Sequence, residues 1–131
     1  MTIDSNKTAF RIMVIDDCPH AGKTAELFLK KQGHTALCCQ SAIHALGTVT
    51  SFKPEIIFID ADMPTVTGFQ ACDLLREFGG TENIPLFILS GTGNAENRAE
   101  GRMSGATGFV LKPLDDEKLT AALAAISSTG G

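Results

Sequence analysis

The sequence predicts an α/β domain, a doubly wound five-stranded parallel sheet with five helices. Two observations lead to this fold class. Several short runs are almost wholly apolar, as expected of strands that a parallel sheet buries on both faces. Segments with apolar residues at helical spacing alternate with these runs, and such alternation favours parallel strands joined by crossover helices. At 131 residues the chain is expected to form one domain.

The first strand is expected at residues 10–15, which are mostly apolar and lead directly into Asp16 and Asp17. The first helix is expected at residues 21–32, where apolar side chains recur at helical spacing. Pro19 fits the first turn of this helix, because its missing N–H has no partner to lose there.

The second strand is expected at residues 35–39, and a second helix follows, with Ser41 as its cap and its end near Phe52. The third strand is the most apolar. It comprises Ile56-Ile57-Phe58-Ile59 and ends at Asp60. An acidic side chain at the carboxyl end of a buried strand lies where open α/β sheets bind their ligands.

A third helix is expected at residues 69–78, before an apolar strand at 85–90 that ends in a serine. The fourth helix is expected at 92–104 from its place in the alternation, although Gly93 and Gly101 weaken the pattern.

The last strand is expected at residues 108–111, followed directly by Lys112, and the last helix at 115–126, where leucines and an isoleucine form one stripe. Residues 1–9 are interpreted as an N-terminal extension and 127–131 as a flexible tail.

Composition excludes several classes of function. Hydrophobic residues make up 44% of the chain and charged residues 20%, which is typical of globular domains and not of disordered or membrane-spanning chains. The net charge is −4, and the largest basic cluster is the pair Lys30-Lys31, so nucleic-acid binding is not expected. The longest apolar runs are too short to span a bilayer, and no signal peptide is visible, so the protein is expected to be cytoplasmic.

Cysteines and histidines do not form a recognisable site in the sequence. The four cysteines lack metal-site spacing and are interpreted as reduced and structural; they are Cys18, Cys38, Cys39 and Cys72. The three histidines are interpreted as scattered surface residues; they are His20, His34 and His44.

Polar side chains from four strands should meet at one edge of the sheet, because the carboxyl ends of parallel strands lie together. They are Asp16, Asp17, Asp60, Ser90 and Lys112. Clustered carboxylates repel one another, and oxygen ligands with room for water suit Mg²⁺ or Mn²⁺. A carboxylate beside a cation, a hydroxyl and an ammonium group is equipped to attack a phosphoryl group.

The same residues carry a family resemblance that covers about residues 10–126. The motifs are Asp16-Asp17, Asp60 with Met63-Pro64 and Gly68, Ser90-Gly91, Gly105-Ala106 and Lys112-Pro113. In this order and spacing the chain resembles a response-regulator receiver domain of two-component signalling, of the stand-alone type. The resemblance implies a flavodoxin-like (βα)5 fold and a phosphorylation-controlled switch that is not an enzyme beyond its own phosphorylation and dephosphorylation.

The resemblance also implies roles for individual residues. Asp60 would be the phosphoacceptor, and Ser90 and Lys112 would contact the phosphoryl group. The metal ligands would be Asp16, Asp17, Asp60 and the backbone carbonyl of Asp62. Phe109 falls at the aromatic switch position, where an inward rotation accompanies movement of Ser90.

The implied phosphodonor is a histidine kinase or a histidine phosphotransfer protein. The implied output is altered affinity for a protein target in trans, at the surface of the last two helices and the fifth strand. Two alternatives stay open. Asp60-Ala61-Asp62 resembles the start of haloacid-dehalogenase-type phosphatases, although Pro64 stands where that motif has Thr or Val. The chain could also be a pseudo-receiver that serves as a scaffold without being phosphorylated.

Overall fold

The computed structural model describes residues 9–63, 66–78, 80–91 and 105–129. All five predicted strands are present and pair in parallel, in the order β2-β1-β3-β4-β5. The strands are β1 (Arg11–Ile15), β2 (Thr35–Cys39), β3 (Ile56–Asp60), β4 (Leu86–Ser90) and β5 (Gly108–Leu111). The doubly wound parallel sheet predicted from the sequence is therefore confirmed.

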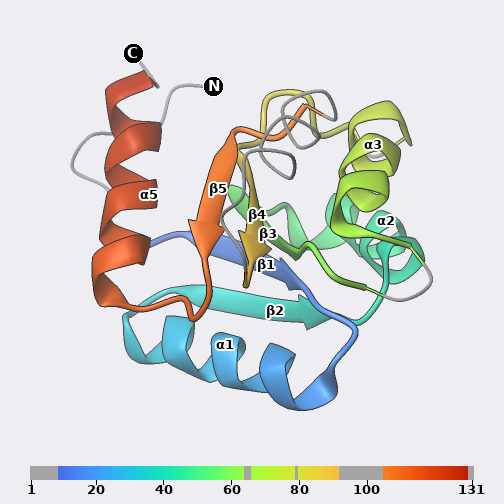
Figure 1. Ribbon diagram of the computed structural model, residues 1–131. Helices are drawn as coiled ribbons and strands as arrows, with labels where there is room; N and C mark the ends of the chain where they lie inside the picture. Colours follow the sequence, from blue (N-terminus) through green and yellow to red (C-terminus); the bar gives the residue numbers. More distant parts are fainter. Residues whose placement is uncertain (1–8, 64–65, 79, 92–104, 130–131) are drawn as a thin grey trace.

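Four of the five predicted helices lie within the described residues, and they are α1 (Pro19–Lys31), α2 (Ala42–Phe52), α3 (Gly68–Phe78) and α5 (Asp116–Thr129). The helix predicted at 92–104 lies outside the described residues. Helices α1 and α5 cover one face of the sheet, and α2 and α3 cover the other (Figure 1). Among the described residues, no helix has the length and apolar character needed to cross a membrane.

The helix boundaries follow from local chemistry. Helix α1 begins at Pro19, two residues before the predicted start, because proline suits a first helical turn. Ser41 caps α2 as predicted, since its Oγ accepts a hydrogen bond from the backbone N–H of His44 at 3.0 Å. Helix α5 extends to Thr129, beyond the predicted end at Ile126, because no helix-breaking residue follows before Gly130.

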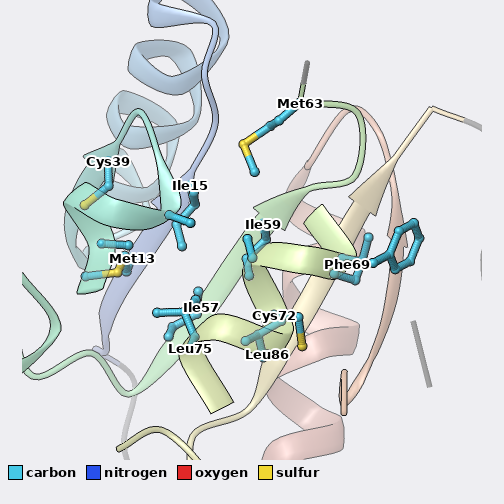
Figure 2. Packing of buried hydrophobic residues seen from close by; sticks show 14 of the residues in the cluster. Met13, Ile15, Cys39, Ile57, Ile59, Met63, Phe69, Cys72, Leu75 and Leu86 are labelled. Carbon is cyan, nitrogen blue, oxygen red and sulfur yellow. The ribbon is translucent and has the colours of Figure 1, made fainter. Parts of the chain in front are cut away.

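The strands alternate their side chains between two cores. One core lies against α2 and α3; Met13, Ile15, Ile57 and Ile59 contribute to it from the sheet (Figure 2). The other lies against α1 and α5 and contains the alternate strand residues, which include Ile12, Val14, Ile56 and Phe58. Every residue of β3 and β4 is buried, which explains why these strands are uninterrupted apolar runs.

His34 is not a surface residue, and its interpretation as one was wrong. Only 7% of it is exposed, and its Nδ1 accepts a hydrogen bond from the backbone N–H of Phe10 at 3.1 Å. It lies directly before β2, and its ring packs against the Phe10 ring at 5.8 Å between centroids. The imidazole thus provides an acceptor for a buried backbone N–H at the amino edge of the sheet.

Candidate acidic phosphoacceptor site

The predicted site residues meet at the carboxyl edge of the sheet. Asp16 follows β1, Asp60 ends β3, Ser90 ends β4 and Lys112 follows β5. Backbone hydrogen bonds hold the chain in register as it leaves the strands: the N–H of Asp16 donates to Cys39 O at 3.0 Å, and the N–H of Lys112 donates to Ser90 O at 2.9 Å. The convergence expected from the strand ends is therefore present.

Three carboxylates form the centre of the site. One oxygen from each of Asp16, Asp17 and Asp60 lies within 4.8 Å of the other two. Asp16 and Asp60 are buried, whereas Asp17 is partly exposed. Buried like charges at this separation repel strongly, and an oxygen-only set of this kind is what Mg²⁺ and Mn²⁺ prefer. The residues present fit a hard divalent cation.

Asp60 also forms an ion pair with Lys112. The Lys112 Nζ lies 2.6 Å from Asp60 Oδ1, and the same oxygen accepts a hydrogen bond from the backbone N–H of Asp62 at 3.3 Å. The Lys112 side chain is 35% exposed and the Asp60 side chain 6% exposed. The ammonium group thus reaches from the solvent side onto a buried carboxylate.

The charges of this site shift the pKa values of its members. Burial raises the pKa of Asp16 and outweighs the hydrogen bond from the Cys18 N–H, while the nearby charges of Asp60 and Asp17 raise it further. Burial by itself would lower the pKa of Lys112, but the hydrogen bond and the charge of Asp60, together with Asp16, raise it overall. The site therefore carries an excess of negative charge and a firmly protonated lysine.

Two of the carboxylates are oriented by the turns in which they lie. Asp16 Oδ1 accepts a hydrogen bond from the backbone N–H of Cys18 at 3.0 Å. In the same way, Asp60 Oδ1 accepts one from the backbone N–H of Asp62. Such turns are a known use of Asp, because its short side chain reaches its own backbone. Cys18 is also the residue that precedes α1, so the turn ends where the helix begins.

Gly68 has a role at this site that was not predicted from the sequence. A Cβ atom on Gly68 would lie 2.8 Å from Ala61 Cα and 2.9 Å from the carbonyl carbon of Asp60. The N–H of Gly68 also donates to Ala61 O at 3.1 Å. Glycine therefore allows the start of α3 to pack directly on the backbone of Asp60. Its place between a loop and a helix in the sequence gave no sign of this contact.

The remaining predicted residues flank the acidic centre. Ser90 is buried at the end of β4, next to β3 in the sheet. Asp62 is exposed and lies two residues after Asp60. Phe109 is partly buried on β5, and its ring packs against Phe69 of α3 with 6.3 Å between centroids. The aromatic ring thus connects the edge strand β5 to α3.

Comparisons with known proteins agree with this geometry. Residues 12–124 match the family described as the response regulator receiver domain. Protein PilG of Pseudomonas aeruginosa is 31% identical over 123 residues, which cover 94% of this chain and 91% of PilG. Protein PilH of the same organism is 28% identical over 116 residues, which cover 88% of this chain and 96% of PilH.

A solved structure of the chemotaxis protein CheY4 of Vibrio cholerae has the same fold, with a TM-score of 0.81 and 24% identity over 88% of this chain and 96% of CheY4. Since the family match spans most of the chain, the chain belongs to the response regulator receiver domains, the phosphorylation-controlled signalling switches of two-component systems.

Proposed function

We propose that Asp60 is the residue that accepts the phosphoryl group, and that the donor is a phosphohistidine of a histidine kinase or a histidine phosphotransfer protein. The observation that carries this proposal is the position of Asp60. It is at once a member of the three-carboxylate cluster and the partner of Lys112 at 2.6 Å. A nucleophile for a phosphoryl group needs cationic groups beside it, because the incoming oxygens are negatively charged.

The phosphoryl group would pass from a histidine nitrogen to a carboxylate oxygen. A carboxylate oxygen of Asp60 forms a bond to phosphorus while the phosphorus–nitrogen bond of the phosphohistidine breaks. The leaving imidazole keeps the electron pair and takes up a proton. The product is an aspartyl phosphate, which adds negative charge to an edge that already carries three carboxylates.

We assign a divalent cation, Mg²⁺ or Mn²⁺, to the carboxylates of Asp16, Asp17 and Asp60 and to the backbone carbonyl of Asp62. The raised pKa of Asp16 supports this assignment, because it reflects a carboxylate that is buried first of all and that also lies beside the charges of Asp60 and Asp17. When bound, the cation would offset the repulsion among the carboxylates and neutralise phosphoryl oxygens.

Lys112 and Ser90 would hold the phosphoryl group. The raised pKa of Lys112 keeps its ammonium group charged at neutral pH, so that it can pair with a phosphoryl oxygen as it now pairs with Asp60. Ser90 ends the strand next to β3, and its hydroxyl would donate a hydrogen bond to another phosphoryl oxygen.

Phe109 would convert the modification into a change of surface. Its ring packs against Phe69 in this structure. Phe109 lies on β5, the strand that directly precedes Lys112. A rotation of the Phe109 ring that accompanies a shift of Ser90 would alter the surface around β5 and α5, and so the affinity for a protein target in trans.

The phosphatase and the pseudo-receiver scaffold are not favoured, because family membership accounts for Asp16, Asp17 and Lys112 together with Asp60. A direct test incubates the chain with acetyl phosphate and Mg²⁺ and follows the mass of the intact protein. We expect one added phosphoryl group on the wild type and on Asp73→Asn, an exposed control on α3, and none on Asp60→Asn. Equal modification of Asp60→Asn would refute the assignment, and steady turnover of small phosphoesters would favour the phosphatase.

A further inference from the structure

Helix α1 packs closely against strand β2 at Gly22. A Cβ atom on this buried glycine would overlap Cys38 Sγ of β2, and it would also lie 3.7 Å from Cys38 Cβ and 3.8 Å from Asp16 Cβ. The thiol of Cys38 thus occupies the space that a side chain at position 22 would need. Directly beside it lies a carboxylate residue of the acidic cluster.

A second contact ties the same helix to the same strand residue. Glu26, one helical turn after Gly22, accepts a hydrogen bond from the backbone N–H of Cys38 through Oε1 at 3.2 Å. Residues four apart lie on one helix face, so Gly22 and Glu26 together face Cys38. The distance between α1 and β2 is therefore set at Cys38 by close packing and by a hydrogen bond.

The close approach is directly connected to the carboxylates. The N–H of Gly22 donates to the carbonyl of Cys18 at 2.9 Å, which is the first turn of α1, and the N–H of Cys18 donates to Asp16 Oδ1. Asp17 lies between Asp16 and Cys18. A displacement of the first turn of α1 would thus be transmitted to two of the three carboxylates.

The glycine has a cost that calls for a reason. In a helix interior, glycine is less favourable than alanine. Gly47 in α2 shows the contrast, since a Cβ atom there would meet nothing within 4 Å. Cys38 leaves no room for a side chain at Gly22, whereas a side chain at Gly47 would have room.

We propose that Gly22 and Cys38 form a matched pair that positions Asp16 and Asp17 for the divalent cation. The inference rests on the proposed function, because it concerns the cation of the same site. Neither residue touches the reacting atoms. Both act through the placement of α1, so they are positioning residues.

The test is a set of substitutions measured by Mg²⁺ titration calorimetry and thermal unfolding. In Gly22→Ala, the new methyl group should push α1 outward and weaken Mg²⁺ binding by roughly tenfold, the size typical of losing a residue that orients metal ligands. Removing the thiol in Gly22→Ala/Cys38→Ala should make room for the methyl group and restore most of the affinity. Gly47→Ala should leave the affinity unchanged.

A measurement without metal tests the placement of α1 independently of whether the site binds Mg²⁺. In ¹H–¹⁵N spectra without Mg²⁺, the amide signals of Asp17 and Cys18 should shift in Gly22→Ala and return in the double variant. If the wild type fails to bind Mg²⁺, the proposed function fails while these shifts still test the placement of α1.

Three results would overturn the pairing. The first is a Gly22→Ala protein with wild-type Mg²⁺ affinity and unmoved amide signals, which would mean that the thiol simply turns aside. The second is a loss of affinity that Cys38→Ala does not restore. A change in melting temperature alone, with binding unaltered, would likewise reduce Gly22 to a structural residue.

Discussion

At the carboxyl edge of the sheet, three carboxylates lie within 4.8 Å of one another, and one lysine faces them. At the amino edge, polar groups are paired donor to acceptor: the N–H of Phe10 bonds to His34 Nδ1, and the N–H of Leu86 bonds to Thr107 Oγ1 at 2.9 Å. The same sheet therefore has one edge with unbalanced charge and one edge with satisfied hydrogen bonds.

Arg76 illustrates the amino edge. Its guanidinium group donates to the carbonyl oxygens of Thr81, Ile84 and Gly105, the last at 3.1 and 3.0 Å from Nε and Nη2. One side chain of α3 thus joins the loop before β4 to the turn before β5. Such an edge stabilises the fold, whereas the clustered carboxylates of the carboxyl edge lower its stability, as expected of residues retained for the proposed function. Substitutions at the two edges should accordingly have opposite consequences.

The largest effect is expected for Asp16→Asn. The amide keeps an oxygen to accept the Cys18 N–H, but one ligand charge is lost, so Mg²⁺ affinity should fall by more than about 100-fold. Without metal the variant should be more stable than the wild type at neutral pH, since burial and the neighbouring carboxylates raise the pKa of Asp16. Calorimetric titration and urea unfolding measure the two quantities.

The pH dependence of stability in the wild type and in Asp16→Asn shows whether the charge of Asp16 stabilises or destabilises the fold. A carboxyl group whose pKa is raised in the folded state binds more protons there than in the unfolded state. Without metal, the contribution of Asp16 to wild-type stability should therefore be greatest below pH 3.8, the ordinary Asp pKa. This contribution should be lost as the pH rises through the raised pKa of Asp16. A difference between wild type and variant that does not change with pH would contradict this account.

Arg76→Ala should have the next largest effect, at the opposite edge. Loss of charged hydrogen bonds to three carbonyl groups should lower the free energy of unfolding by about 2 kcal/mol. Because Arg76 does not contact the carboxylates, the folded variant should keep its Mg²⁺ affinity. Lys23→Ala, which removes an ion pair between a largely exposed lysine and Glu26, is the control and should change little, since Lys30 also pairs with Glu26. Parallel losses of stability and of Mg²⁺ affinity in Arg76→Ala would show that the two edges are coupled.

The smallest effect is expected for His34→Asn and concerns pH. Burial lowers the pKa of His34, so the folded state disfavours the protonated imidazole. The stability that the Phe10 N–H bond contributes is present above the ordinary value of 6.5 and is lost as the pH falls through the lowered pKa, because protonated Nδ1 cannot accept. Asparagine keeps an acceptor that does not titrate.

Urea unfolding between about pH 7.5 and pH 5.5 measures this difference, which should amount to about 1 kcal/mol at most. Wild type should lose more stability than His34→Asn over that range, while the exposed His44→Asn should behave like the wild type. Identical pH profiles for wild type and His34→Asn would show that His34 does not titrate in the folded protein.

Sequence patterns predicted the strands well because each is an unbroken apolar run, and burial on both faces demands such runs. They predicted the acidic site for a related reason, since parallel strands share one carboxyl edge. They did not predict the burial of His34, the close backbone contact at Gly68 or the hydrogen bonds of Arg76. Each of these residues acts through a partner distant in sequence or through a backbone approach that no local pattern records.

The alternation of strands and helices can be inferred from the sequence alone, and so can the chemical identity of the groups at the strand ends: carboxylates, a serine and a lysine. The distances between these groups follow only from the folded chain. The strand order places β1 beside β3, so that Asp16 and Asp60 become neighbours. Burial, with a further contribution from this neighbouring charge, raises the pKa of Asp16. The tertiary structure also places Gly22 against Cys38. Distances of this kind depend on which strands pair and how closely helices pack on them, and these are properties of the folded chain as a whole.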